Sequence, residues 1–309
     1  MDILQTLLAS WQVRHTRRQK DAFLSFAKEY GEKLGYPCRV EENKGWLMCR
    51  NFVAGDPEKA KIVLTAHYDT CSRMPFPNKI FPDHRHLSLL IQMCWIVPLA
   101  LFCAGLGLLA RHFSGIDALY PPVFLTTYFG IFALLFFGPA NPHTANDNTS
   151  GVAAILAIMA ALPEEKRKEA AFILFDNEEY GLVGSKAYNK AHKDAMAEKP
   201  LFNLDCVGDG DRMYLILPKD ADEATEQRYR AAFPAENGFS VTLRRADKTR
   251  YNSDQRSFPR GAALAAFHQG RFGSTLGRIH TKRDTVCSEQ NLRFAVDGAL
   301  RLIDLTSKE

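Results

Sequence analysis

The apolar positions of this chain follow two different spacings in turn. Helical spacing, with apolar residues three or four apart, predicts helices within 4–34, 152–162, 184–192, 221–233 and 290–305. Short β-prone apolar runs predict strands at 46–52, 61–66, 171–175, 201–205, 213–217, 239–244 and 262–267. Helices that alternate with short buried strands indicate an α/β fold.

Two longer stretches depart from both spacings. Residues 87–110 contain no charged side chain in 24 positions, and a second uncharged apolar run covers 121–138. As helices they would be roughly 36 and 27 Å long, against a hydrocarbon core of about 30 Å. A short charged loop at 111–117 joins them. We therefore expect one domain over 1–309 with a hydrophobic, transmembrane helical hairpin inserted at 84–141.

The basic residues around this hairpin favour a cytoplasmic location for the main domain. Both ends of a hairpin emerge on one side of a membrane, and basic residues concentrate on the cytoplasmic side. Arg73, Lys79 and Arg85 flank the ends of the hairpin, whereas its loop contains the single Arg111. We expect a membrane protein that is associated with the bilayer through the two apolar stretches.

The alternative is a soluble cytoplasmic protein on which the hairpin forms a lid or a dimerisation arm. Gln92, Pro98 and the adjacent prolines at 121 and 122 favour this alternative, because they weaken apolar helices. The oligomeric state stays open.

Composition narrows the class of protein. With 309 residues, of which 46% are hydrophobic and 24% charged, the chain is long enough to bury one large core. The net charge of +4 is spread along the sequence, so we expect no nucleic-acid partner. Seven scattered cysteines without a CxxC spacing argue against a disulfide framework and a zinc knuckle, and they indicate a reducing compartment.

Two adjacent carboxylates follow one of the predicted strands. The apolar run Phe172–Phe175 leads to Glu178 and Glu179, and then to Gly181. Open α/β sheets bind ligands at the carboxyl ends of their strands, where one carboxylate could bind a metal ion while its neighbour transfers protons. A solvated turn without a chemical role is the alternative.

A histidine ends another predicted strand. The apolar run 61–66 is followed by His67, Tyr68 and Asp69. Residues two apart in an extended chain point the same way, so Asp69 could accept the second ring N–H of His67, orient the ring and raise its basicity. The alternative for His67 alone is a ring that only satisfies a neighbouring backbone group.

Three further residues complete a candidate set. Asp147 precedes the helix at 152–162, where an N-cap is the alternative role. Asp205 ends the strand at 201–205, and His280 lies between the last strand and the final helix. With His67 and Glu179, these residues supply two imidazoles and three carboxylates. Such a set suits two divalent ions that share one carboxylate, with zinc, manganese or cobalt as candidates.

An ordered series of short motifs carries a family resemblance. The motifs are HYD at 67–69, NDNTSG at 146–151, EE at 178–179, NLD at 203–205, SDQRSF at 253–258 and HTKRDT at 280–285. In this order they resemble metallopeptidase family 28, the aminopeptidase Y and bacterial leucyl aminopeptidase group of co-catalytic zinc exopeptidases. The resemblance implies a three-layer α/β fold with a mixed, mostly parallel twisted sheet. It also implies a zinc-dependent aminopeptidase that acts on a peptide or another aminoacyl substrate.

The same resemblance assigns the metal ligands. It implies that His67 and Asp205 bind one zinc ion, that Glu179 and His280 bind a second, and that Asp147 bridges the two.

It also assigns the residues that handle protons. Glu178 would be the general base, and Asp69 would orient His67. The chain departs from some relatives at Ile279, where they place a tyrosine that supports the oxyanion. It departs again in the apolar hairpin, which replaces a short loop near the rim of the expected active site.

Two other functions remain open. A glutaminyl cyclase shares this fold and the paired glutamates, but it catalyses intramolecular aminolysis at a single zinc ion. A catalytically silent membrane or adaptor protein would also keep the fold, and the loss of a ligand would mark it. The complete set of ligands favours the aminopeptidase.

Overall fold

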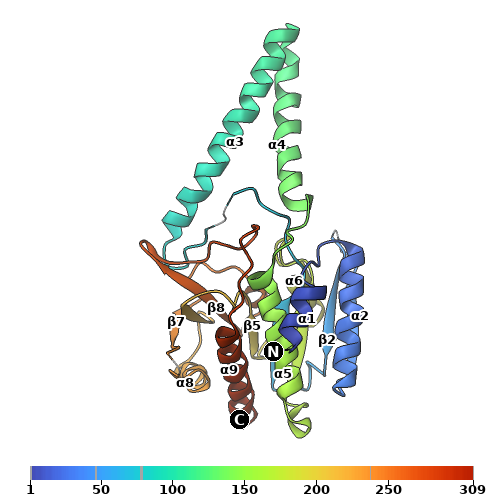
Figure 1. Cartoon of the computed structure of the whole chain (residues 1–309), viewed down its shortest axis with the longest axis vertical. Coiled ribbons are helices and arrows are strands. Elements are labelled where there is room, and N and C mark those ends of the chain that lie inside the picture. Colours follow the sequence, from blue (N-terminus) through green and yellow to red (C-terminus); the bar gives the residue numbers. More distant parts are fainter. Residues whose placement is uncertain (1, 46, 77–78, 237, 309) are drawn as a thin grey trace.

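A mixed sheet forms the centre of the main domain, with helices on both faces (Figure 1). The computed structural model describes residues 2–45, 47–76, 79–236 and 238–308. Within these residues the sheet has nine strands in the order β1-β2-β4-β3-β5-β8-β6-β7, with β9 paired to β8. The strands are β1 (Cys38–Asn43), β2 (Cys49–Ala54), β3 (Ile62–His67), β4 (Ala170–Phe175), β5 (Leu201–Leu204), β6 (Arg212–Leu217), β7 (Val241–Arg245), β8 (Gly261–Gly270) and β9 (Gly273–Thr275).

The strands β4, β3, β5 and β8 are parallel and occupy the centre of the sheet, and β6 is parallel to β7. Antiparallel pairing joins β1 to β2, β2 to β4, β6 to β8 and β8 to β9. The predicted α/β fold with a mixed sheet is confirmed. Parallel pairing does not predominate, however, because short connections such as those of β1 to β2 and β8 to β9 can join only antiparallel strands.

The helices and helical turns lie on both sides of this sheet and in the hairpin. The helices are α1 (Asp2–Ser10), α2 (Arg17–Lys33), α3 (Arg85–Ser114), α4 (Tyr120–Phe137), α5 (Gly151–Ala161), α6 (Val183–Ala191), α7 (Lys193–Met196), α8 (Glu223–Ala232) and α9 (Glu289–Ser307). Shorter turns are η1 (Asp117–Leu119), η2 (Ala145–Ser150), η3 (Glu164–Lys166) and η4 (Asp254–Ser257).

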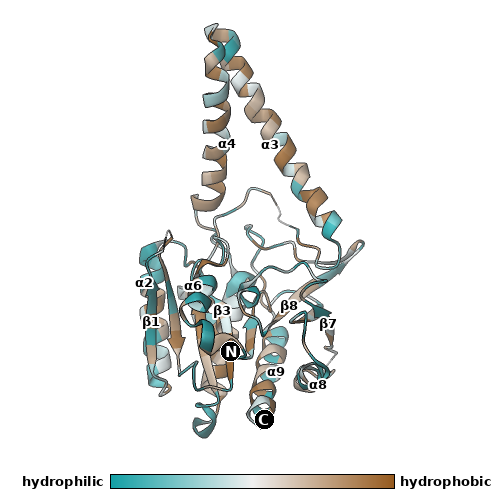
Figure 2. Cartoon of the chain, turned by 180° about the vertical axis from the view of Figure 1, so that it is seen from behind, coloured by the Kyte–Doolittle hydropathy of each residue, from teal (hydrophilic) through white to brown (hydrophobic). Residues whose placement is uncertain are grey.

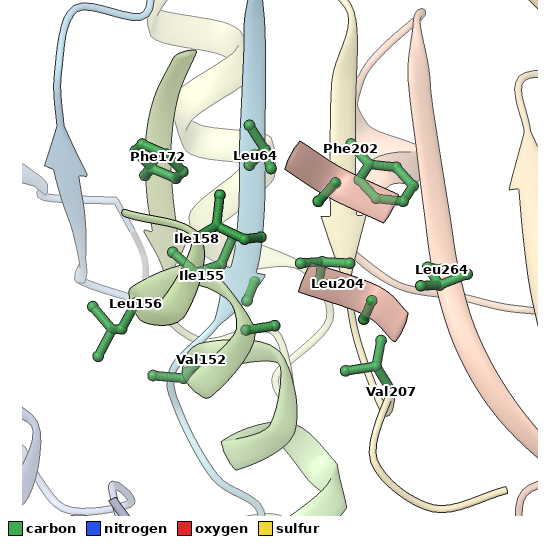
Figure 3. Close-up of a cluster of buried hydrophobic side chains, with 14 of the residues drawn as sticks. Leu64, Val152, Ile155, Leu156, Ile158, Phe172, Phe202, Leu204, Val207 and Leu264 are labelled. Atoms are coloured by element: carbon green, nitrogen blue, oxygen red, sulfur yellow. The ribbon is translucent and has the colours of Figure 1, made fainter. Parts of the chain in front are cut away.

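Alternate residues of the central strands face two separate cores. Leu64 and Phe172 point toward the core that α1, α2, α5, α8 and α9 cover, where α5 lies against the sheet (Figure 3). Val63 precedes Leu64 in β3, and Ile173 follows Phe172 in β4. Both residues point toward the core with α6 and α7. This period of two places a helical layer on each face of the sheet.

Local sequence explains most element boundaries. The helical spacing over 4–34 belongs to two helices, because Thr16 caps α2: its side chain accepts from the Gln19 N–H, and its own N–H donates to the Gln19 side chain. Strand β1 was not predicted, since its polar sequence lies at the exposed edge of the sheet. Position 46, at the start of one predicted strand, lies outside the described residues.

The two apolar stretches form a helical hairpin that projects away from the sheet (Figures 1 and 2). Helix α3 extends beyond the apolar run at both ends and stops at Gly115, whose φ of 67° suits glycine. The prolines at 121 and 122 lie in the first turn of α4, where a missing N–H costs no hydrogen bond. They therefore begin this helix rather than weaken it. By length and composition, both helices could cross a membrane.

The chain segments that precede and follow the insert pair with each other on the domain. Ser72 pairs with Ala140 in an isolated antiparallel bridge, and the Asn141 N–H donates to the Cys71 carbonyl oxygen at 3.0 Å. The insertion therefore leaves β3 and α5 in contact.

A buried ion pair connects α2 to the end of β4. Lys20 Nζ lies 2.6 Å from Asp176 Oδ1 and 2.6 Å from Asn177 Oδ1. We expect Lys20→Met to lower the free energy of unfolding by about 3–5 kcal/mol, because it leaves the Asp176 carboxylate buried without its counter-charge. Urea denaturation measures this change.

The control for this variant is Lys33→Met. Lys33 forms an exposed pair with Glu29 on the same helix, and exposed pairs contribute little. A similar loss of stability in both variants would contradict the assigned role of the buried pair.

Candidate metal centre

Three neighbouring strands deliver polar side chains to one edge of the sheet. His67 is the last residue of β3, Asp205 directly follows β5, and Glu178 and Glu179 follow β4 after a short turn. Since β4, β3 and β5 are adjacent and parallel, their carboxyl ends open on the same edge.

Asp147 and His280 reach this edge from loops. Asp147 lies in η2 ahead of α5, and His280 lies between β9 and α9. Asp147 Oδ1 is 3.3 Å from His67 Nε2, and Asp147 Oδ2 is 3.0 Å from His280 Nε2. The Asp147 carboxylate therefore stands between the two imidazoles with one oxygen toward each.

The remaining predicted ligands complete two groups. Asp205 Oδ1 lies 3.5 Å from His67 Nε2, and ligand atoms of His67, Asp147 and Asp205 are all within 4.8 Å of one another. Glu179 Oε2 lies 3.1 Å from His280 Nε2. The structure thus brings all five predicted ligands together, whereas their binding of metal stays a prediction.

Cys71 is a further member of the second group, and the sequence motifs did not indicate it. One ligand atom each from Cys71, Glu179 and His280 lie within 4.8 Å of one another. Cys71 follows His67 by four residues on the segment that leaves β3. Its position close to the end of β3 was the feature of the sequence that could have indicated this role.

Asp69 contacts both His67, as predicted, and the paired glutamates. His67 Nδ1 is closer to the Asp69 carbonyl oxygen, at 3.1 Å, than to the Asp69 carboxylate, at 3.5 Å. The carboxylate also accepts the N–H groups of Glu178 at 3.0 Å and Glu179 at 3.2 Å. Asp69 therefore orients His67 mainly through its backbone, and its side chain positions the paired glutamates.

Asp284 orients the loop that carries Asp147. Its two carboxylate oxygens accept the N–H groups of Asn146 at 2.7 Å and Asp147 at 3.0 Å. The Asn146 side-chain oxygen in turn accepts the N–H groups of Gly208 and Asp209. The sequence showed Asp284 only as part of a motif, because its partner lies 137 positions away.

We expect Asp284→Ala to reduce metal affinity by roughly 10–100-fold, the range typical of residues that orient a ligand without binding the metal. Titration of the metal-free protein with zinc against a competing chelator measures the change. Asp297→Ala on the exposed face of α9 is the control. Equal affinities in the two variants would remove Asp284 from this role.

Two other buried residues lie beside the site. Asp254 belongs to the sequence motif at 253–258, and Tyr251 lies just before this motif. The Tyr251 hydroxyl donates to the Asp205 carbonyl oxygen at 3.0 Å. Neither carboxylate oxygen of Asp254 has a hydrogen-bond partner among the described residues. Burial, with Asp69 and Asp205 nearby, raises the pKa of Asp254 to about 7 against the opposing effect of His67. Ile279 packs in an apolar cluster that includes Tyr251.

The electrostatics of the cluster reflect many carboxylates in a small buried volume. Burial raises the pKa of Glu179 to about 8, although His280 opposes the shift. Burial lowers the pKa of His280, but Glu179 and Asp147 outweigh it and raise that pKa to about 9. Burial also raises the pKa of Glu178 well above its usual value, opposed by His67 and reinforced by Asp254. Shifts of this kind are typical of functional sites.

Three residues beside the cluster have left-handed backbone, which side chains other than glycine rarely adopt. They are Asn177 (φ 57°), Cys206 (φ 55°) and His280 (φ 61°). Such conformations concentrate where a fold positions functional groups. His280 is itself a predicted ligand, and the other two residues lie within two positions of one.

The donor atoms fit divalent cations. Glu179 Oε1 and Asp205 Oδ1 are buried and accept no hydrogen bond from the described residues. Buried acceptors without a donor are costly, and a cation supplies the positive charge that they lack. Imidazole nitrogen and carboxylate oxygen are ligands that zinc takes.

One protein family matches this chain. A family model described as peptidase family M28 matches residues 127–295, more than half of the chain. The match includes Asp147, Glu178, Glu179, Asp205 and His280, whereas His67 and Asp69 precede it. None of the curated proteins matches the chain in sequence.

Several solved structures have a similar fold. The LapA aminopeptidase of Legionella pneumophila has a TM-score of 0.59 and 15% identity, over 100% of this chain and 71% of LapA. Glutaminyl cyclase of Porphyromonas gingivalis has a TM-score of 0.60 and 16% identity, over 98% of this chain and 97% of the cyclase. A Zn-dependent exopeptidase of Parabacteroides distasonis has a TM-score of 0.58 and 15% identity, over 98% and 97%. At such identities the likeness shows the fold alone.

Proposed function

Because the chain belongs to peptidase family M28, we propose that it is a zinc-dependent aminopeptidase that removes N-terminal residues from peptides or other aminoacyl substrates. Membership of this family confirms the resemblance carried by the ordered motifs. The proposal also includes the number of zinc ions, which is two, and a preference for substrates with a free N-terminus.

The position of Asp147 carries the proposal. Its two carboxylate oxygens lie 3.3 and 3.0 Å from ring nitrogens of His67 and His280. A carboxylate with one oxygen toward each of two ligand groups suits a pair of ions that share it. In this proposal His67 and Asp205 hold one zinc ion, Glu179 and His280 hold the other, and Asp147 contributes to both.

The mechanism uses the remaining glutamate of the pair. Two bound zinc ions would polarise the scissile carbonyl group and lower the pKa of the attacking water. Glu178 accepts the proton of that water and donates it to the leaving amine.

Backbone hydrogen bonds hold this general base in position. The N–H groups of Glu178 and Glu179 both donate to the Asp69 carboxylate. One residue therefore aligns the general base and a predicted ligand at the same strand end, and hydrolysis requires no nucleophilic side chain. Cys206 and Ser253 have packing roles in this account.

Glutaminyl cyclase is the second candidate. The similar fold of the Porphyromonas gingivalis enzyme extends over nearly the whole of both chains. Such a reaction would use Glu178 to move a proton from the substrate amine while the side-chain amide leaves as ammonia. The second group around Glu179 and His280 favours hydrolysis with two ions.

The test compares both reactions in one preparation. The purified chain is loaded with zinc, its metal content is measured, and it is given aminoacyl-4-nitroanilides, their N-acetylated forms and a glutaminyl peptide. We expect two zinc ions per chain and hydrolysis of the substrates with a free amine only. Cyclisation with a single ion would replace the proposal by the second candidate, and an absence of both reactions would indicate a catalytically silent protein.

A further inference from the structure

We propose that α3 and α4 insert into an anionic lipid bilayer and that unpaired basic side chains around the base of the hairpin hold the domain against the membrane surface. The proposal goes beyond the catalytic function and does not depend on it.

The surface of the hairpin is apolar and uncovered. Among the described residues of α4 none is buried, and in α3 only Ser88, Cys103 and Gly107 are. Phe113 is 82% exposed and Leu101 67% exposed, and apolar residues cover most of both helices (Figure 2). Soluble monomers rarely expose apolar patches larger than a few hundred Å².

The geometry of the hairpin suits a bilayer. The shorter span, Asp117–Phe137, has 21 residues, and at about 1.5 Å per residue it matches a hydrocarbon core of about 30 Å. At the tip, Arg111 and Asp117 form an ion pair at 2.5 Å. Pairing lowers the cost of moving these two charges across the membrane.

Eight lysine and arginine residues line three cavities around the base of the hairpin, and we call six of them the basic rim. They are Arg73, Arg85, Arg250, Arg271, Lys282 and Arg283. They come from five separate parts of the sequence and line three cavities beside the start of α3 and the loop before it. Arg250 also donates to Gln92 on α3 at 3.0 Å, and Phe76, beside Arg73, stacks on Trp95 of α3 at 4.3 Å.

The basic rim is not neutralised by close ion pairs, although Asp83 and Asp247 line two of the same cavities. Among the described residues, none of the six side chains forms an ion pair with a carboxylate, whereas the nearby Arg244 pairs with Asp83 at 2.9 Å. Unpaired cations at the base of an apolar hairpin complement the anionic lipids of a cytoplasmic leaflet. The same asymmetry, with one paired arginine at the tip, favours a cytoplasmic domain.

The arrangement also brings the metal centre to the membrane surface. Phe137 at the end of α4 stacks on Tyr180, the neighbour of Glu179, with ring centroids 5.3 Å apart. On the other side, the Met74 N–H donates to the His280 carbonyl oxygen at 2.8 Å. The residues that carry the second ligand group thus contact segments that lead into the hairpin.

Flotation with lipid vesicles tests the proposal on the full chain. We expect the chain to float with vesicles of phosphatidylcholine and phosphatidylserine and to resist extraction by alkaline carbonate. Leu101→Lys with Phe129→Lys, on exposed apolar positions of both helices, should abolish resistance to extraction.

Brominated acyl chains should quench Trp95 fluorescence, measured as the difference between the wild type and Trp95→Phe.

The basic rim is tested separately. Arg271→Glu with Lys282→Glu should weaken binding to phosphatidylserine vesicles several-fold and leave binding to phosphatidylcholine unchanged. The control is Lys61→Glu, an exposed and unpaired lysine at the opposite end of β3. Equal effects of the rim and control variants would overturn the role of the rim. A wild type that stays unbound, or that dimerises through the hairpin without lipid, would overturn insertion.

A different observation supports a second proposal, which rests on the proposed metal site. We infer that the Cys71 thiolate is a ligand of the ion held by Glu179 and His280. Ligand atoms of the three residues lie within 4.8 Å of one another, and Cys71 is buried. Beside it, the Glu179 side chain is only 7% exposed and its Oε1 has no partner among the described residues.

A sulfur ligand would change the metal preference of the site. Thiolates favour zinc, whereas sites with only nitrogen and oxygen ligands also take manganese. Glu179, His280 and Asp147 would supply three ligands and Cys71 a fourth, so water or substrate would have to bind this ion as an additional ligand.

Cobalt substitution tests this ligand without using activity. The cobalt-loaded wild type should show a sulfur-to-cobalt charge-transfer band in the near ultraviolet, which Cys71→Ser removes and Cys49→Ser, at a buried position in β2, keeps. Bound cobalt without this band would overturn the role of Cys71 and leave the hydrolase intact. A band without hydrolysis would overturn the hydrolase only, and failure to bind cobalt would overturn both.

Discussion

Replacing Glu178 by glutamine is expected to lower kcat by about 10²–10⁴-fold while metal content stays unchanged. Glutamine has the same shape as glutamate, but its amide cannot accept the proton of the attacking water. The N–H of residue 178 would still donate to Asp69, so the strand end should keep its conformation. The measurement is the steady-state rate on an aminoacyl-4-nitroanilide, together with the zinc content of the same sample.

Glu164→Gln is the matched control, because Glu164 is an exposed glutamate in a helical turn that precedes β4, whereas Glu178 follows the other end of this strand. It should keep the wild-type rate. If Glu178→Gln retains most of the activity, another group is the general base. If it loses zinc, Glu178 is a ligand and the roles of the two glutamates must be exchanged.

Asp147→Asn is expected to lose metal at both groups and with it all measurable turnover. The substitution removes the negative charge and replaces one of the two oxygens that face His67 and His280 with an amide NH₂. The affinity should fall by more than the roughly 10–100-fold expected for residues that only orient a ligand. Metal content per chain after dialysis against a weak chelator is the measurement.

Asp220→Asn, at an exposed position after β6, is the control and should keep both ions. Loss of one ion from Asp147→Asn with tight retention of the other would show that Asp147 serves a single ion. Unchanged metal content would mean that Asp147 pairs with His67 and His280 but does not bind the ions.

The architecture explains why residues so far apart in sequence meet. Parallel neighbours in a sheet end on one side, so His67, Glu179 and Asp205 need only the order of β4, β3 and β5 to become neighbours. Asp147 and His280 depend on loops instead. The hydrogen bonds of Asp284 to the segment before α5 show how the loop after His280 and the loop of Asp147 hold each other.

The sequence alone determined the α/β class, the two apolar helices and the five predicted ligands at the candidate metal centre. Each of these follows from local information: the spacing of apolar residues, the length of an uncharged run, or a polar residue at the end of a strand. The prolines at 121 and 122 were the exception, because the local sequence suggested that they weaken the second apolar helix. Their effect depends on their position in the helix, and only the boundaries of α4 showed that they lie in its first turn.

Only the tertiary structure decided how these residues contact one another. Asp69 follows His67 closely, yet its carboxylate bonds to the backbone of residues more than 100 positions later. Cys71 joined the second group, and the basic rim assembled from separate segments, because the paths of loops bring them together. Such contacts depend on the order of strands and on the packing of loops, which no local spacing encodes.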